Sequence, residues 1–276
     1  MRTSSNPAFR NLPRGAAAGG GYAGFNQPQG GVPGYGKPQA PAGAADRPMT
    51  VDDVVMKTGA CIGTALLTGA PTAIWAQSQL AAGSMGAVFG ALIIGMLVGL
   101  GLSLFIIFKQ KASGPLTLAY SAAEGVFLGA FTGVFQSFVS PGQPLALQAI
   151  LGTGLVFIAM LVVYKTGAVK VTPKLTKWVI GAAAGAFMLM LVNLVVGMFN
   201  GEGIGIRGTG PLAIGISLLF IGIAAFMLLL DFDMADRMIR DGMPSKWAWF
   251  AAFGLMTTLV WLYLEMVRLL AALNSE

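Results

Sequence analysis

From about residue 50 onward, the chain alternates long apolar stretches with short polar ones. An α-helix needs about 20 predominantly apolar residues to cross roughly 30 Å of hydrocarbon. Seven stretches meet that length, at about 54–76, 85–108, 115–138, 145–164, 178–199, 211–235 and 249–272. The pattern therefore predicts an all-α membrane protein in which residues 50–276 form a bundle of seven transmembrane helices.

Residues 1–49 have a different pattern, because Gly, Pro, Ala and Gln dominate them. Such a segment buries too little apolar surface to offset the entropy of the chain, and it contains no apolar core of the signal-peptide kind. We predict a disordered cytoplasmic tail. Where it ends, Thr50 and Asp53 have the spacing of a helix capping box, and Pro71 is predicted to bend the helix that follows.

Composition narrows the classes of function. Mean hydropathy is +0.74 and 10% of the residues are charged, against about 25% in soluble domains. The sequence has no histidine and a single cysteine, Cys61, which excludes histidine bases, histidine-ligated metals and an intrachain disulfide. We attribute the net charge of +6 to basic loops that orient the protein in the membrane and attract anionic lipids, rather than to nucleic-acid binding. We expect no cofactor, no bound metal and no nucleic-acid partner.

The charges of the loops predict the orientation of the bundle. Basic residues gather in the loops at 109–114, 165–177 and 236–246, whereas the loops at 77–84 and 139–144 carry no charge. Loops rich in Lys and Arg stay in the cytoplasm. We therefore expect a cytoplasmic amino terminus and a carboxyl terminus on the outer side.

Glycines recur at four-residue spacing inside the predicted helices, as in Gly95/Gly99 and Gly125/Gly129/Gly133. Small residues with that spacing let two helix backbones approach closely. We expect them to pack helices against one another within one chain, with a dimer face as the alternative. The expected assembly is a monomer or a weak oligomer.

Three carboxylates interrupt the apolar spans: Glu124 in the third, Asp231 near the end of the sixth and Glu265 in the seventh. An ionised carboxylate in hydrocarbon costs about 2.5–3.5 kcal/mol on insertion scales, so such groups face a protein interior or a water-filled cavity. Glu265 has a simpler interpretation, because Arg268 lies three residues later and suits an intrahelical ion pair. Asp231 also has a simpler interpretation, in which it belongs to a solvated helix end on the cytoplasmic side.

The interpretation that carries a function is an acidic pair between the sixth and seventh helices. Two carboxylates in contact cannot easily both ionise, so Asp231 and Glu265 are expected to share a proton near neutral pH. Loss of that proton creates a repulsion that parts the helices, and carboxylates along the opening favour cations such as Ca²⁺. Secondary candidates for the same pathway are Asp233, Arg268 and Asn193, a polar residue within the fifth span.

Four stretches together carry a resemblance to a known family. MTVDDVVMKTG precedes the first span, PLTLAYSAAEGVFLGAF lies in the third, LLLDFDMADRMI ends the sixth and LVWLYLEMVRLL lies in the seventh. Over about residues 50–276 the chain resembles the Bax inhibitor-1 family, also called the transmembrane Bax inhibitor motif family, and in particular its bacterial members. The resemblance implies a seven-helix bundle in the bacterial plasma membrane that acts as a pH-sensitive calcium leak.

The resemblance also implies roles for single residues. The family's acidic pair, which senses pH, falls on Asp231 and Glu265, although the family commonly has Asp at the second position. Glu124 matches an acid that many members carry in the third helix. Some bacterial members add an acid and an arginine in the second helix as a latch, but here that helix has neither, and Lys109 lies only at its end.

Simple spans keep the two acids of the pair apart. Asp231 lies near the cytoplasmic end of its span, whereas Glu265 is about 18 residues, or roughly 27 Å, past Trp247. Contact requires the seventh helix to start well inside the cytoplasm, or the sixth to continue past Ile239.

Two other functions stay open beside the cation leak. One is a membrane regulator that binds other membrane proteins without conducting, and the other is a proton-coupled transporter, for which no inverted repeat is visible. An intramembrane aspartyl protease is disfavoured, because no GxGD-type context surrounds the acids, and we expect no enzymatic activity. The expected partners are the lipid bilayer, calcium ions and protons, with membrane proteins added under the regulator alternative.

Overall fold

The computed structural model describes residues 47–139, 142–201, 203–206, 208 and 210–274. The helices of these residues are α1 (Val51–Ala81), α2 (Met85–Lys109), α3 (Gly114–Phe138), α4 (Leu145–Thr166), α5 (Pro173–Asn200), α6 (Pro211–Arg240), the short 3₁₀ helix η2 (Ser245–Trp247) and α7 (Ala248–Asn274). Seven of them are long and apolar enough to cross a membrane. The predicted all-α fold with seven spans is confirmed, and the predicted tail lies, up to residue 46, outside the described residues.

Helix α6 is longer than the pattern of apolar residues predicts. It continues to Arg240 rather than ending at about 235. Two ion pairs at i,i+4 spacing support the additional turn, with 2.6 Å between Asp233 and Arg237 and 3.1 Å between Asp236 and Arg240. Opposite charges four residues apart stabilise a helix, so the charged end of the sixth span is helical.

The starts of α1 and α5 are set by capping residues. The predicted capping box is confirmed, because the Thr50 hydroxyl accepts a hydrogen bond from the Asp53 backbone N–H while the Asp53 carboxylate accepts one from the Thr50 N–H. Helix α1 then continues through Pro71. Helix α5 begins earlier than predicted, because Thr172 caps it and Pro173 occupies its first turn, where a missing N–H costs nothing.

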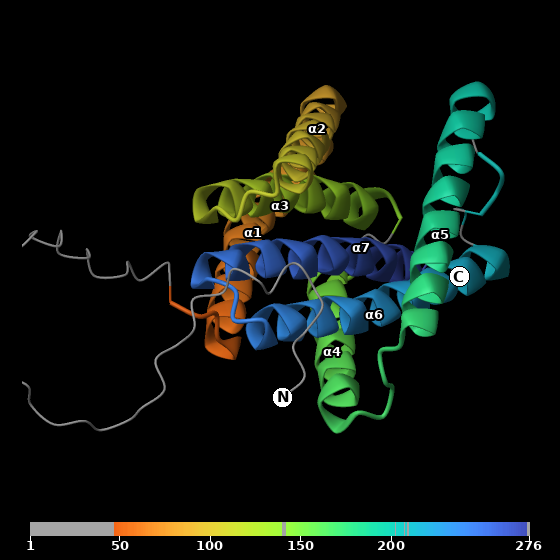
Figure 1. Cartoon of the computed structure of the whole chain (residues 1–276). Coiled ribbons are helices and arrows are strands. Elements are labelled where there is room, and N and C mark those ends of the chain that lie inside the picture. The colour runs from red at the N-terminus through yellow and green to blue at the C-terminus, as the bar shows by residue number, and fades with distance from the viewer. Residues whose placement is uncertain (1–46, 140–141, 202, 207, 209, 275–276) are drawn as a thin grey trace, which may run out of the picture. The chain divides into compact units, whose positions relative to one another are not determined.

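Helix α7 lies at the centre of the bundle. Figure 1 shows it between α3 and α6, and α1 and α4 also pack against it. Its buried positions run around the helix and include Ala252, Phe253, Leu262 and Val267. A helix surrounded in this way places polar groups against protein rather than lipid, which matters for the acids described below.

Helices α1 and α3 meet through glycines. A Cβ built on Gly69 of α1 would lie 3.0 Å from the carbonyl oxygen of Gly125 in α3, and one built on Gly129 would lie 2.9 Å from Cβ of Thr72. The two backbones are therefore too close for larger side chains. The expected packing role within one chain is confirmed for these glycines of α3.

The residues just before α1 pair with the turn between α6 and α7. The Met49 N–H donates to the Met243 carbonyl and the Ser245 N–H donates to the Arg47 carbonyl, both at 2.8 Å. The Lys57 ammonium adds a 2.5 Å hydrogen bond to the Ser245 carbonyl. We call residues 47–49 the lead-in segment, and it ties the start of α1 to the α6–α7 turn.

Candidate functional site

Asp231 lies on α6 and faces α7. It is partly buried and follows the fully buried Leu228 and Leu229. The Thr258 hydroxyl of α7 donates a 2.5 Å hydrogen bond to Oδ2, and Gly254, one turn earlier, leaves space beside Oδ1. Asp231 therefore lies in the α6–α7 interface rather than at a solvated helix end.

Glu265 lies on α7, and its side chain is only 1% exposed. Arg268, one turn later, places Nη1 3.8 Å from Oε1 of Glu265. The guanidinium of Arg268 also lies 5.5 Å from the centre of the Phe131 ring on α3, at a distance where a cation and an aromatic face attract each other. The ion pair predicted from the i,i+3 spacing is present, and it leads from the buried acid toward the surface.

Asp231 has a hydrogen-bond partner on α7 other than Glu265. The partner of Asp231 is Thr258, which precedes Glu265 by seven residues, or about 10 Å along a helix. The reason is the short connection from Arg240 to Ala248, which fixes the antiparallel register of the two helices. Asp231 thus forms a carboxylate–hydroxyl pair with Thr258, and its pairing with Glu265 stays a prediction.

Glu124 lies on α3 and faces α2. A Cβ built on Gly99 would come within 2.8 Å of Oε1, so the carboxylate lies directly against the α2 backbone. One turn before Glu124, the hydroxyl of the buried Tyr120 is 3.3 Å from the Thr257 hydroxyl of α7. This acid therefore belongs to a polar region between α2, α3 and α7, separate from the contact of Asp231.

Thr257 and Thr258 are functional candidates that reasoning from sequence missed. They are consecutive in α7 and contact different helices, Thr257 the Tyr120 hydroxyl of α3 and Thr258 the Asp231 carboxylate of α6. The signal was the pair of hydroxyls in the apolar run LMTTLVW, because polar groups inside a span are expected to find partners. Which partners they find depends on the rotation of α7.

The secondary candidates Asn193 and Asp233 have contacts of a different kind. The Asn193 side-chain oxygen accepts a 3.0 Å hydrogen bond from the backbone N–H of Ile204, which anchors the connection after α5. Asp233 pairs with Arg237 on its own helix at 2.6 Å. Neither contact joins the two residues to Glu124, Asp231 or Glu265.

The site thus distributes three carboxylates over α3, α6 and α7. Their chemistry is proton uptake and attraction of cations, since an ionised carboxylate attracts a cation and a protonated one does not. The Asp231–Thr258 bond joins α6 to α7. A relative movement of α6 and α7 therefore has to change the surroundings of Asp231.

Comparison with known proteins shows the family to which this chain belongs. The family described as Bax inhibitor 1 like matches residues 6–275, which includes most of the tail as well as all seven spans. Comparison with curated protein sequences finds no match. Because the family match covers nearly the whole chain, the protein is an integral membrane protein that belongs to the Bax inhibitor-1-like family.

Proposed function

We propose that the protein is a pH-sensitive leak pathway for Ca²⁺ and similar cations, regulated by protonation of acids within its spans. The observation that carries the proposal is the hydrogen bond from Thr258 to Asp231, because it places a carboxylate between two helices. Membership of the family supports the same function. In the arrangement described here, Thr258 of α7 donates the hydrogen bond that the Asp231 carboxylate accepts.

Two effects of ionising Asp231 oppose each other, and their magnitudes decide the direction of the pH dependence. An ionised Asp231 strengthens the Thr258 bond, and hydrogen bonds to charged groups contribute about 1.5–3 kcal/mol. It also attracts cations, by about 4 kcal/mol for two unit charges 4 Å apart at an effective dielectric constant near 20, and by more for a divalent ion. The attraction is larger, so cation flux rises with pH.

Four neighbouring charged groups on α6 and two on α7 are engaged in ion pairs. Asp233 and Asp236, further along α6, pair with Arg237 and Arg240. On α7, Glu265 pairs with Arg268. We therefore assign the regulating titration to Asp231, with Glu265 and Glu124 as further acids of the pathway.

The test is Ca²⁺ flux into dye-loaded liposomes that contain the purified full-length protein, measured between about pH 6 and 8. Wild type should show flux that rises with pH. Asp231→Asn should lose the pH dependence, and Glu265→Gln and Glu124→Gln should lower the flux. Asp233→Asn is the matched control, since it removes a neighbouring carboxylate of the same helix and should keep the wild-type profile.

Flux no greater than that of empty liposomes at any pH would refute the channel and favour a regulator that does not conduct. An unchanged pH profile in Asp231→Asn would refute the assignment of the sensor to that residue.

A further inference from the structure

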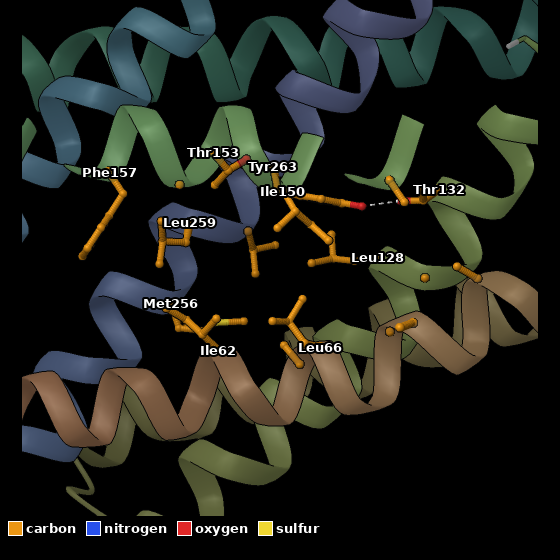
Figure 2. A pocket seen from close by; sticks show the side chains of 18 residues that line it. Ile62, Leu66, Leu128, Thr132, Ile150, Thr153, Phe157, Met256, Leu259 and Tyr263 are labelled. Atoms are coloured by element: carbon orange, nitrogen blue, oxygen red, sulfur yellow. Dashed lines mark hydrogen bonds between the residues drawn. The ribbon is translucent and has the colours of Figure 1, made fainter. Parts of the chain in front are cut away.

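A cavity of about 260 Å³ lies between α1 and α4, and α3 and α7 complete its walls (Figure 2). The α7 side chains in its wall include Met256, Leu259 and Tyr263. Asp231, Glu265 and Glu124 do not belong to the lining. The cavity is therefore distinct from the acidic site, although α7 contributes to both.

The lining is apolar. Among the 18 described residues that form it, none is charged. Of its three hydroxyl groups, those of Thr132 and Tyr263 bond to each other at 2.9 Å, as Figure 2 shows. The buried hydroxyl of Thr153 makes no hydrogen bond with a described residue. A water molecule needs two to four polar partners, so these walls favour an apolar occupant, and they offer nothing to a charged lipid headgroup.

The cavity is continuous with the surface that faces lipid. Leu66 of α1 and Ile150 of α4 line it and are nevertheless 43% and 39% exposed. Their neighbours Leu67 and Leu151 are 79% and 57% exposed, as expected for helix faces in contact with hydrocarbon. Lipid chains therefore have direct access to the space between α1 and α4.

We propose that this cavity is a binding site for one acyl chain of a membrane lipid, which enters between α1 and α4 and lies against Met256 and Val260 of α7. The volume fits this occupant. An apolar cavity of about 150 Å³ already takes up benzene, whereas pockets for whole drug-sized ligands start at about 300 Å³. Part of a chain fits, and its headgroup stays at the membrane surface.

The driving force is packing. Lipid chains are as apolar as the protein wall, so the hydrophobic effect adds little inside a bilayer. An empty cavity, however, leaves its wall atoms without van der Waals partners on one side. A chain lying against Met256 and Val260 restores those contacts.

The site is tested with proteoliposomes of the full-length protein that contain phosphatidylcholine with a photoreactive diazirine in the middle of one acyl chain. After illumination, mass spectrometry locates the adducts. We expect adducts on Met256 and Val260, which are only 4% and 8% exposed and which line the cavity. Leu155, 68% exposed on α4, reports general contact with lipid in every sample.

Two variants fill the cavity from opposite sides. Gly154 lines it, and a Cβ there meets no atom within 4 Å, so Gly154→Leu has room to extend into the cavity. Ala70→Leu does the same from α1. Both should lose most of the labelling of Met256 and keep that of Leu155. Gly185→Leu is the matched control, because Gly185 on α5 also has open space around it and lies outside the cavity.

Adducts confined to outward-facing residues such as Leu155 would overturn the proposal. Undiminished labelling of Met256 in Gly154→Leu and Ala70→Leu, with Leu155 labelled as in wild type, would overturn it as well. The labelling pattern does not depend on Ca²⁺ flux, so failure of this proposal can be told apart from failure of the proposed channel function.

Discussion

The hydrogen bond between Thr258 and Asp231 gives the sharpest energetic prediction. Thr258→Val removes the hydroxyl that donates the 2.5 Å bond and keeps nearly the same side-chain shape. Thr258 itself is buried, so water has little access to replace the lost donor. The variant should therefore weaken the α6–α7 interface without creating a cavity.

The size of the effect follows from the partner and the surroundings. Hydrogen bonds to charged groups contribute about 1.5–3 kcal/mol in soluble proteins. Interhelical bonds in membranes average about 0.6 kcal/mol and reach about 1.7. The short bond and the carboxylate acceptor place this contact at the upper end of the membrane range, so we expect a coupling energy of about 1.5 kcal/mol.

A double-mutant cycle isolates that energy. The free energy of unfolding is measured in mixed detergent micelles for wild type, Thr258→Val, Asp231→Leu and the double variant. The neighbouring Thr257→Val, combined with Asp231→Leu, is the matched control and should be additive, because Thr257 contacts Tyr120 instead. If Thr258→Val and Asp231→Leu are also additive within about 0.4 kcal/mol, the bond does not join the helices and the reasoning fails.

Two further predictions concern packing and capping. Gly129→Ala should lower the free energy of unfolding by about 1–3 kcal/mol, because the new Cβ would lie 2.9 Å from Cβ of Thr72. Gly185→Ala, with open space around it, should cost nothing, and equal unfolding midpoints for the two variants would contradict the close α1–α3 contact. Asp53→Ala removes half of the capping box and the 2.6 Å ion pair with Arg47, at a cost of about 1 kcal/mol. Hydrogen exchange should accelerate in the first turn of α1 and stay unchanged in α3, and an unaltered first turn would speak against the cap.

Local features of the fold were predictable from the sequence. Hydropathy locates seven spans, because a stretch of about 20 predominantly apolar residues is typical of a transmembrane helix. The capping box at Thr50 and Asp53 was predictable because it depends on two nearby residues. The end of α6 was missed because its charged residues suggest solvent, while Asp233 and Arg237 also stabilise a further turn.

The arrangement of the acids was not predictable in the same way. Sequence identifies Asp231 and Glu265 as unusual, since each interrupts an apolar run. Which residue faces Asp231 depends on the register and rotation of α7, and these are set by the length of the α6–α7 turn and by packing on all sides. That Thr258 donates a hydrogen bond to Asp231 is therefore a property of the assembled bundle.

The pairing of the lead-in segment with the α6–α7 turn has a consequence for the order of assembly. Lys57 and the Ser245 carbonyl that it contacts are 188 residues apart in the chain. At a synthesis rate of about 5–20 residues per second, roughly 10–40 s separate the two residues at the ribosome. The contact between the start of α1 and the α6–α7 turn can therefore form only after the ribosome has synthesised Ser245. The amino-terminal end of α1 can thus take its final place only after the α6–α7 turn has been synthesised.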